Sequence, residues 1–150
     1  MNRAGHVGFT LTVIGLILYS INIVSRDSII LLLLSGAFSA LPDIDLRLEI
    51  RHRRYTHNVI VATIVSIPVG LLTYYAGLGF WVGFLACLSG FLCHIFSDLL
   101  TYMSFPPLWP INKKEVSLKL FNSNNKVVNG LFTVLGALIT LTFILRFYAI

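Results

Sequence analysis

The chain has 150 residues, of which 57% are hydrophobic and only 11% are charged, whereas a soluble globular domain is typically about 25% charged. The mean hydropathy of +0.86 comes from several long apolar runs, which excludes an ordinary soluble domain and indicates an integral membrane protein. The net charge of +5 falls in short segments between these runs, which favours anionic lipid headgroups over nucleic acid as partners.

Five apolar segments divide the chain, and we expect them to be the helices of a single membrane domain that comprises residues 1–150. They cover about residues 7–24, 28–42, 57–76, 79–103 and 130–148. At about 1.5 Å per residue, all but the short second segment are long enough to cross a hydrocarbon core of about 30 Å. The predicted fold class is therefore all-α, a polytopic helix bundle with about five transmembrane helices.

The polar connections predict how the chain is oriented in the membrane. The long loop 104–129 carries Trp109 among its prolines and is expected to lie along the membrane interface, with 116–120 as a short strand or interfacial segment. If the N-terminus is cytoplasmic, all of the 11 Lys and Arg residues except Arg26 and Arg146 fall on the cytoplasmic side. The positive-inside rule therefore predicts a multi-pass protein of the cell (inner) membrane, with the N-terminus inside and the C-terminus outside.

Two pairs of polar residues end apolar segments at this cytoplasmic side. His94 and Asp98 are four residues apart, so they share one face of a helix, at a depth where ionisable groups usually mark a functional site. Asp43 and Asp45 follow the short second segment, where two carboxylates at the negative end of a helix dipole favour a bound cation. Taken singly, His94 and Asp98 could form a simple ion pair, and Asp43 and Asp45 could lie in a solvated turn at the end of a helix.

Two further histidines begin apolar segments at the same side, so the polar residues together predict a metal site. Imidazole and carboxylate form a normal ligand set for Zn²⁺, Mn²⁺ or Fe²⁺, and a set this large suits two ions about 3.5–4 Å apart. We therefore predict one or two divalent ions, with zinc favoured over manganese or iron. The predicted ligands are His6, Asp43, Asp45, His57, His94 and Asp98.

The basic run 51–54 has two interpretations. It is either a topology signal of solvated charges or a phosphate-binding group beside the metals, because guanidinium groups bind phosphate oxygens in a bidentate manner. Arg53 and Arg54 are nearest to His57, and His52 is either a general acid or base or an ordinary surface residue. We take His52, Arg53 and Arg54 as the candidate catalytic residues.

As a set, these motifs resemble the LexA-regulated, membrane-bound metal-dependent hydrolase family. The resemblance covers residues 6 to about 110, and the family's His-Arg-x-x-Thr-His motif typically continues with Ser, where this chain has Asn58. It implies a bacterial or archaeal membrane protein with a metal-dependent hydrolase site, and it leaves the substrate open. The matching motifs are Ala-Gly-His6, Leu-Pro-Asp43-Ile-Asp45, the run from His52 to His57, and His94-x-x-x-Asp98.

The leading hypothesis is a hydrolase that cleaves an ester, above all a phosphoester, of a membrane lipid at the cytoplasmic interface. Two alternatives stay open. A metal-ion or proton transporter also uses His and Asp inside a bundle, although its path needs polar residues across the whole membrane. A non-catalytic scaffold with a structural metal would enclose the ion completely. The oligomeric state is left open by the sequence.

Overall fold

The computed structural model describes residues 1–46 and 56–149. These ranges form five α-helices and one short 3₁₀-helix, with isolated β-bridges in place of strands, so the predicted all-α class is confirmed. One of the bridges joins Phe105 to Val116, the first residue of the segment 116–120 that was predicted to be a short strand or interfacial segment. The helices are α1 (Arg3–Ser20), α2 (Arg26–Phe38), η1 (Pro42–Leu46), α3 (Val59–Tyr75), α4 (Phe80–Leu99) and α5 (Lys126–Tyr148).

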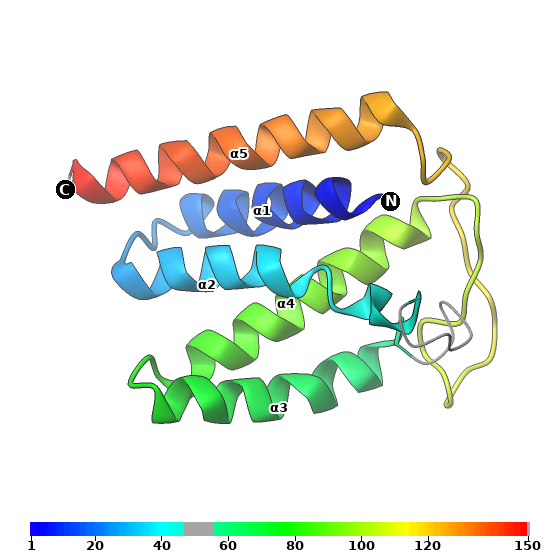
Figure 1. Cartoon of the computed structure of the whole chain (residues 1–150), viewed down its shortest axis with the longest axis horizontal. Coiled ribbons are helices and arrows are strands. Elements are labelled where there is room, and N and C mark those ends of the chain that lie inside the picture. The colour runs from blue at the N-terminus through cyan, green and yellow to red at the C-terminus, as the bar shows by residue number, and fades with distance from the viewer. Residues whose placement is uncertain (47–55, 150) are drawn as a thin grey trace.

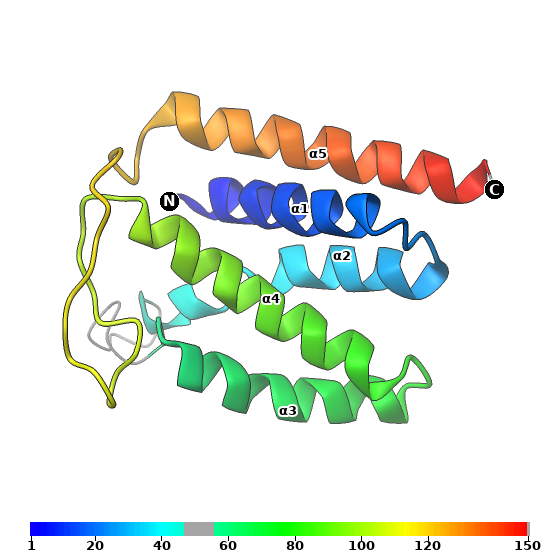
Figure 2. The same cartoon turned by 180° about the vertical axis from the view of Figure 1, so that it is seen from behind.

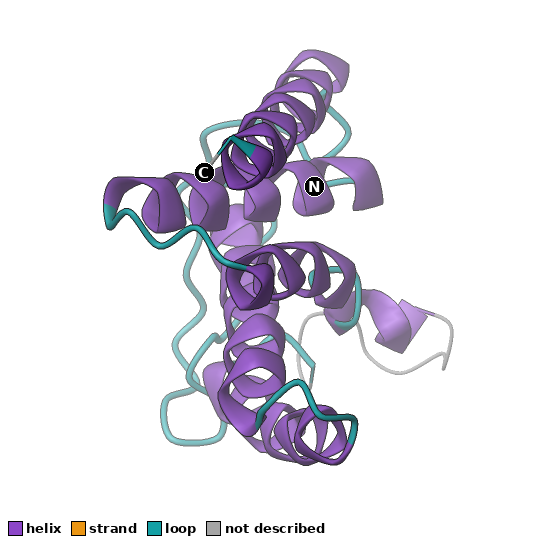
Figure 3. Ribbon diagram, turned by 90° about the vertical axis from the view of Figure 1, so that its left-hand side faces the viewer, coloured by secondary structure: helices purple, strands orange, loops and turns teal. Residues whose placement is uncertain are grey.

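Successive helices run in alternate directions, which brings distant parts of the sequence to the same end of the bundle. The N-terminus, η1, the start of α3, the end of α4 and the start of α5 lie at one end (Figure 1). The C-terminus and the α1–α2 and α3–α4 connections lie at the other end, which faces the viewer in Figure 3. α1 packs mainly against α5, and α4 crosses the bundle obliquely between α2 and α3 (Figure 2).

Three stretches of the described chain are long and apolar enough to cross a membrane, fewer than predicted: Arg26–Asp45, Phe80–Leu99 and Lys126–Tyr148. The predicted short second helix is confirmed, because α2 has only 13 residues. Together with η1 it forms a candidate span of 20 residues, which is longer than the second segment predicted from the sequence. α3 is apolar but has only 17 residues. α1 is not among the three, because several of its positions carry small or polar residues that pack inside the bundle.

Asparagine side chains fix where three of the helices begin. The side chain of Asn2 accepts a hydrogen bond from Gly5 N–H, so α1 begins at residue 3 and not at the predicted residue 7. Asn125 accepts from two backbone N–H groups of the first turn of α5, so this helix begins four residues before the predicted start. Asn58 caps α3 in the same way and leaves His57 just outside that helix.

The close approach of α2 and α4 positions the site. A Cβ atom added to Gly90 of α4 would lie 2.5 Å from the Ser35 carbonyl oxygen and 3.0 Å from the Ser39 nitrogen of α2. Small residues at helix crossings let the two backbones approach in this way. Gly90 therefore holds the end of α2 against the turn of α4 that carries His94.

Large apolar side chains on the outside of the bundle form a surface suited to lipid. Leu72 of α3 is 69% exposed, Trp81 of α4 is 66% exposed and Leu138 of α5 is 53% exposed. Isolated apolar residues are normal on soluble proteins, but apolar faces along several helices are not. Together with the three candidate spans, this surface identifies a helical membrane protein.

Candidate metal centre

The structure brings all six predicted metal ligands to one end of the bundle, from four separate segments of the chain. His6 lies in the first two turns of α1, the two aspartates lie in η1, and His57 directly precedes the Asn58 cap of α3. His94 and Asp98 lie in the last two turns of α4. The side chain of Asp43 is 11% exposed, and the other five residues are buried.

Two histidine Nε2 atoms and two carboxylates form the centre of this cluster. His94 Nε2 lies 3.0 Å from His57 Nε2, 3.5 Å from Asp43 Oδ1 and 3.6 Å from Asp98 Oδ2. His57 Nε2 lies 3.6 Å from Asp43 Oδ1 and 3.5 Å from Asp98 Oδ2. Four ligands at about 2.0–2.1 Å around a tetrahedral zinc ion are about 3.3–3.4 Å from one another. The spacing of these atoms therefore fits the coordination of a metal ion.

His6 extends the cluster on the α1 side. Its Nε2 lies 3.4 Å from Asp98 Oδ1, and its ring stacks on that of His94 with 3.8 Å between centroids. The α-amino group of Met1 also donates to Asp98 Oδ1, at 2.6 Å. Two groups of residues could thus each hold a metal ion, with His94 in both: His6, His94 and Asp98, and Asp43, His57 and His94.

Hydrogen bonds fix the proton of all three histidine rings on Nδ1. Ser97 Oγ donates to the His94 carbonyl oxygen at 2.9 Å, so it accepts from His6 Nδ1 at 2.7 Å. Thr56 Oγ1 donates to Asp45 Oδ2 at 2.6 Å, so it accepts from His57 Nδ1 at 2.9 Å. A hydroxyl has one proton to donate, and this proton is already committed in both cases.

His94 follows the same rule, because its Nδ1 lies 2.6 Å from the Ser39 carbonyl oxygen, which can only accept a hydrogen bond. The Nδ1 proton of each ring is therefore held by the surrounding chain, and each Nε2 is directed toward the cluster. Metal-binding histidines in proteins almost always donate the other ring N–H to such a partner.

Asp45 lies on the other side of the His57 ring from Asp43. Its Oδ2 is 3.4 Å from His57 Nδ1, whereas Asp43 Oδ1 faces Nε2. A 3₁₀-helix turns about 120° per residue, so two residues separated by one position point in different directions. The structure thus places Asp45 beside Nδ1 of His57, where it orients the ring, and places Asp43 beside the Nε2 atoms of His57 and His94.

Loop residues that the sequence did not single out cover the site. Phe105 is 1% exposed, and its ring contacts that of His57 edge to face, with 5.9 Å between centroids. The Pro107 carbonyl oxygen accepts from Val59 N–H, which ties the loop to the start of α3. The supporting residues Ser39, Thr56 and Ser97 were also not among the predicted ligands. The predicted catalytic residues His52, Arg53 and Arg54 lie outside the described residues.

The pKa of His57 connects metal binding to pH. Burial lowers this pKa, but the carboxylates of Asp43, Asp45 and Asp98 outweigh burial and raise the pKa to about 10. The ring is therefore protonated at neutral pH, and the proton on Nε2 occupies the position that a metal ion would take. A metal ion that binds there must displace this proton.

We expect the apparent affinity for zinc to rise about tenfold per pH unit between about pH 6 and about pH 8, because one proton is released as zinc binds to His57. Competition with a coloured chelator on detergent-purified protein measures this affinity. His57→Gln removes the titrating group and is the control. The same affinity at both ends of this pH range would contradict the displacement of a proton.

The bundle and its buried cluster define a class: a helical membrane protein whose His and Asp residues could hold metal ions. The family model of the YdjM inner membrane proteins matches residues 1–150, and the chain therefore belongs to the YdjM inner membrane protein family. This confirms the predicted inner-membrane location, while the orientation of the termini, the LexA regulation and the hydrolase activity stay predictions. No curated protein and no solved structure matches the chain.

Proposed function

We propose that this chain is a metal-dependent hydrolase that cleaves an ester, above all a phosphoester, of a membrane lipid. One observation carries the proposal: three histidines, with Nδ1 held by neighbouring groups, direct Nε2 toward two carboxylates at one end of a membrane bundle. Such a donor set fits zinc, and it also fits manganese or iron. The cluster lies at one end of the helices, so in a membrane it would lie near the depth of the ester groups of lipids.

The residues of the cluster would have separate roles in the reaction. His6, His57 and His94 would hold the ion or ions together with Asp43 and Asp98. A bound divalent ion supplies Lewis-acid activation of the ester and of water at neutral pH. Asp45, placed on the Nδ1 side of a ligand ring, would act as a positioning residue that keeps the ring's orientation.

The catalytic assignments outside the described residues rest on the sequence alone. Arg53 or Arg54 would balance the negative charge that develops on the ester. His52 would exchange a proton with the leaving group.

Phe105 and the buried rings around the cluster would exclude bulk water, which strengthens electrostatic interactions inside the site.

The distribution of polar residues favours this proposal over transport. The elements that carry the six candidate ligands meet at one end of the bundle (Figure 1), whereas a transport path needs polar groups through the full thickness of the membrane. The partial exposure of Asp43 favours a reactive site over a structural ion enclosed on all sides.

Turnover of short-chain phospholipids and acyl esters by the detergent-purified protein tests the proposal. We expect a chelator to abolish turnover, and zinc, manganese or iron to restore it, because the ion supplies the activation of water. Metal-loaded protein that hydrolyses none of these lipids would contradict the proposal. Metal uptake by proteoliposomes, in the absence of lipid turnover, would establish the transporter instead.

A further inference from the structure

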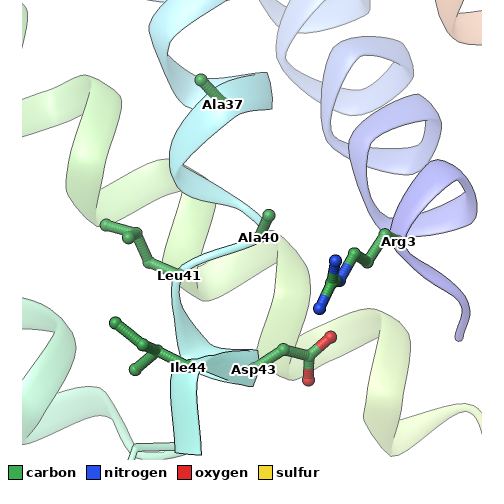
Figure 4. Close-up of a pocket in the computed structure, with 6 residues that line it drawn as sticks. All are labelled: Arg3, Ala37, Ala40, Leu41, Asp43 and Ile44. Carbon is green, nitrogen blue, oxygen red and sulfur yellow. The ribbon is translucent and has the colours of Figure 1, made fainter. Parts of the chain in front are cut away.

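A pocket of about 190 Å³ opens beside the cluster, between the start of α1 and the end of α2 (Figure 4). A water molecule occupies about 30 Å³ in the liquid, and pockets for drug-sized ligands measure about 300–1,000 Å³. The pocket therefore has the size of a small polar group with a short piece of hydrocarbon, not that of a whole lipid. Its lining residues are Arg3, Ala37, Ala40, Leu41, Asp43 and Ile44.

Asp43 joins this pocket to the metal centre. Its carboxylate lines the pocket, and its Oδ1 lies 3.5 Å from His94 Nε2. Its side chain is 11% exposed, whereas the side chains of His57 and Asp98 are at most 1% exposed. A ligand in the pocket would thus meet the cluster at its most accessible member.

Arg3 supplies a positive charge at the mouth of the pocket. It is the first residue of α1, it is exposed, and its guanidinium group points into the pocket toward the Asp43 carboxylate (Figure 4). A guanidinium group presents a planar fork of donors that matches the oxygens of a phosphate. Asp43 would be committed to a bound metal ion, so the charge of Arg3 would be available for an anionic ligand.

The opposite wall is apolar and follows a membrane span. Ala37 lies in α2, Ala40 and Leu41 lie in the link that follows α2, and Ile44 lies in η1, all within the candidate span Arg26–Asp45. The two alanines have short side chains, and Ile44 is 44% exposed. The hydrocarbon next to the phosphate of a bound ligand could therefore lie against this wall and stay in an apolar environment.

We propose that this pocket binds the phosphate group of an anionic amphiphile, with Arg3 as the phosphate-binding residue. The hydrocarbon next to the phosphate lies along the α2 wall, and the phosphate lies beside Asp43. This inference rests on the proposed function, because it assigns a substrate class to the same site: lipids with a phosphate accessible at the membrane interface.

Calorimetric binding of hexylphosphonate, which has no ester bond to cleave, to the detergent-purified full chain tests this inference. Arg3→Gln should weaken binding about tenfold to hundredfold, since a hydrogen-bonded charge pair is lost. Arg3→Lys should restore part of the affinity, because it keeps the charge and loses the planar fork. Arg26→Gln is the matched control: it removes the same charge from the other end of the bundle and should leave binding unchanged.

Binding of inorganic phosphate and of hexanoate shows whether the pocket recognises the hydrocarbon of the ligand and whether it prefers phosphate to carboxylate. We expect both to bind more weakly than hexylphosphonate, and Ala40→Leu, which fills the apolar side of the pocket, to weaken hexylphosphonate more than inorganic phosphate. Equal affinity for inorganic phosphate would overturn the role of the apolar wall. Tighter binding of hexanoate would overturn the assignment to phosphate.

Metal content and ester turnover, measured on the same preparations, separate this inference from the proposed function. Arg3-dependent binding by protein that lacks turnover would support the phosphate pocket and contradict the hydrolase. Unchanged hexylphosphonate binding by Arg3→Gln, in protein that keeps its metal and turnover, would overturn the pocket and leave the hydrolase standing.

Discussion

His94→Ala is expected to weaken metal binding by the detergent-purified protein at least about hundredfold. His94 belongs to both groups of residues that could hold an ion, and its Nε2 lies within 3.6 Å of three other candidate ligand atoms. Loss of an outer hydrogen-bond partner of a metal ligand typically costs about 10–100-fold in affinity, so loss of this central ligand should cost at least about hundredfold. Zinc titration against a competing chelator measures the change.

Two further variants provide zinc affinities with which that of His94→Ala can be compared. Asp45→Asn leaves every Nε2 in place and weakens the contact with His57 Nδ1, so we expect a loss of about 10–100-fold. Cys87→Ala shortens an equally buried side chain of α4 away from the cluster, and it should leave zinc affinity unchanged. Zinc affinity of His94→Ala equal to that of Cys87→Ala would remove His94 from the centre.

Gly90→Ala should destabilise the protein and weaken its metal site together. The added Cβ atom would lie 2.5 Å from the Ser35 carbonyl oxygen, so α2 and α4 must separate, at a cost of about 1–3 kcal/mol. The separation would also move the Ser39 carbonyl oxygen away from His94 Nδ1, which it now approaches to 2.6 Å. We expect a lower unfolding temperature in detergent and about 10–100-fold weaker zinc binding.

Gly130→Ala is the matched control for this variant. Gly130 lies in α5, and a Cβ atom added there would meet nothing within 4 Å. Replacing an unobstructed helical glycine with alanine stabilises by about 0.4–1 kcal/mol. The two substitutions should therefore shift the unfolding temperature in opposite directions, and a shift of the same sign for both would contradict the close packing of α2 on α4.

The gathering of the site at one end of the bundle could be predicted because apolar segments of a membrane protein run in alternate directions. Asp43 ends one such segment and His57 begins the next, so both had to lie on the same side. His94 and Asp98 could be placed on one face because an α-helix brings residues four apart together. The alternating direction of the segments and the spacing within one helix were therefore enough to bring the candidate ligands together.

Other features depend on contacts that no local pattern contains. From the sequence, Asp43 and Asp45 were both predicted to be metal ligands. The 3₁₀ turn directs Asp43 to Nε2 of His57 and Asp45 to Nδ1 of the same ring. η1 also lengthened the second span, because an apolar stretch can continue through a change of helix type. Arg3 is 40 positions from Asp43 in the sequence, and tertiary packing alone places both in one pocket.

The metal content of the wild-type protein, purified in detergent without chelators or added metal, tests the central claim most directly. Elemental analysis should find one or two transition-metal ions per chain in the wild type and a lower content in Asp43→Ala, because the Asp43 carboxylate faces two Nε2 atoms of the cluster. Wild-type protein that carries no transition metal, and takes none up when zinc is supplied, would contradict the metal centre and the hydrolase built on it.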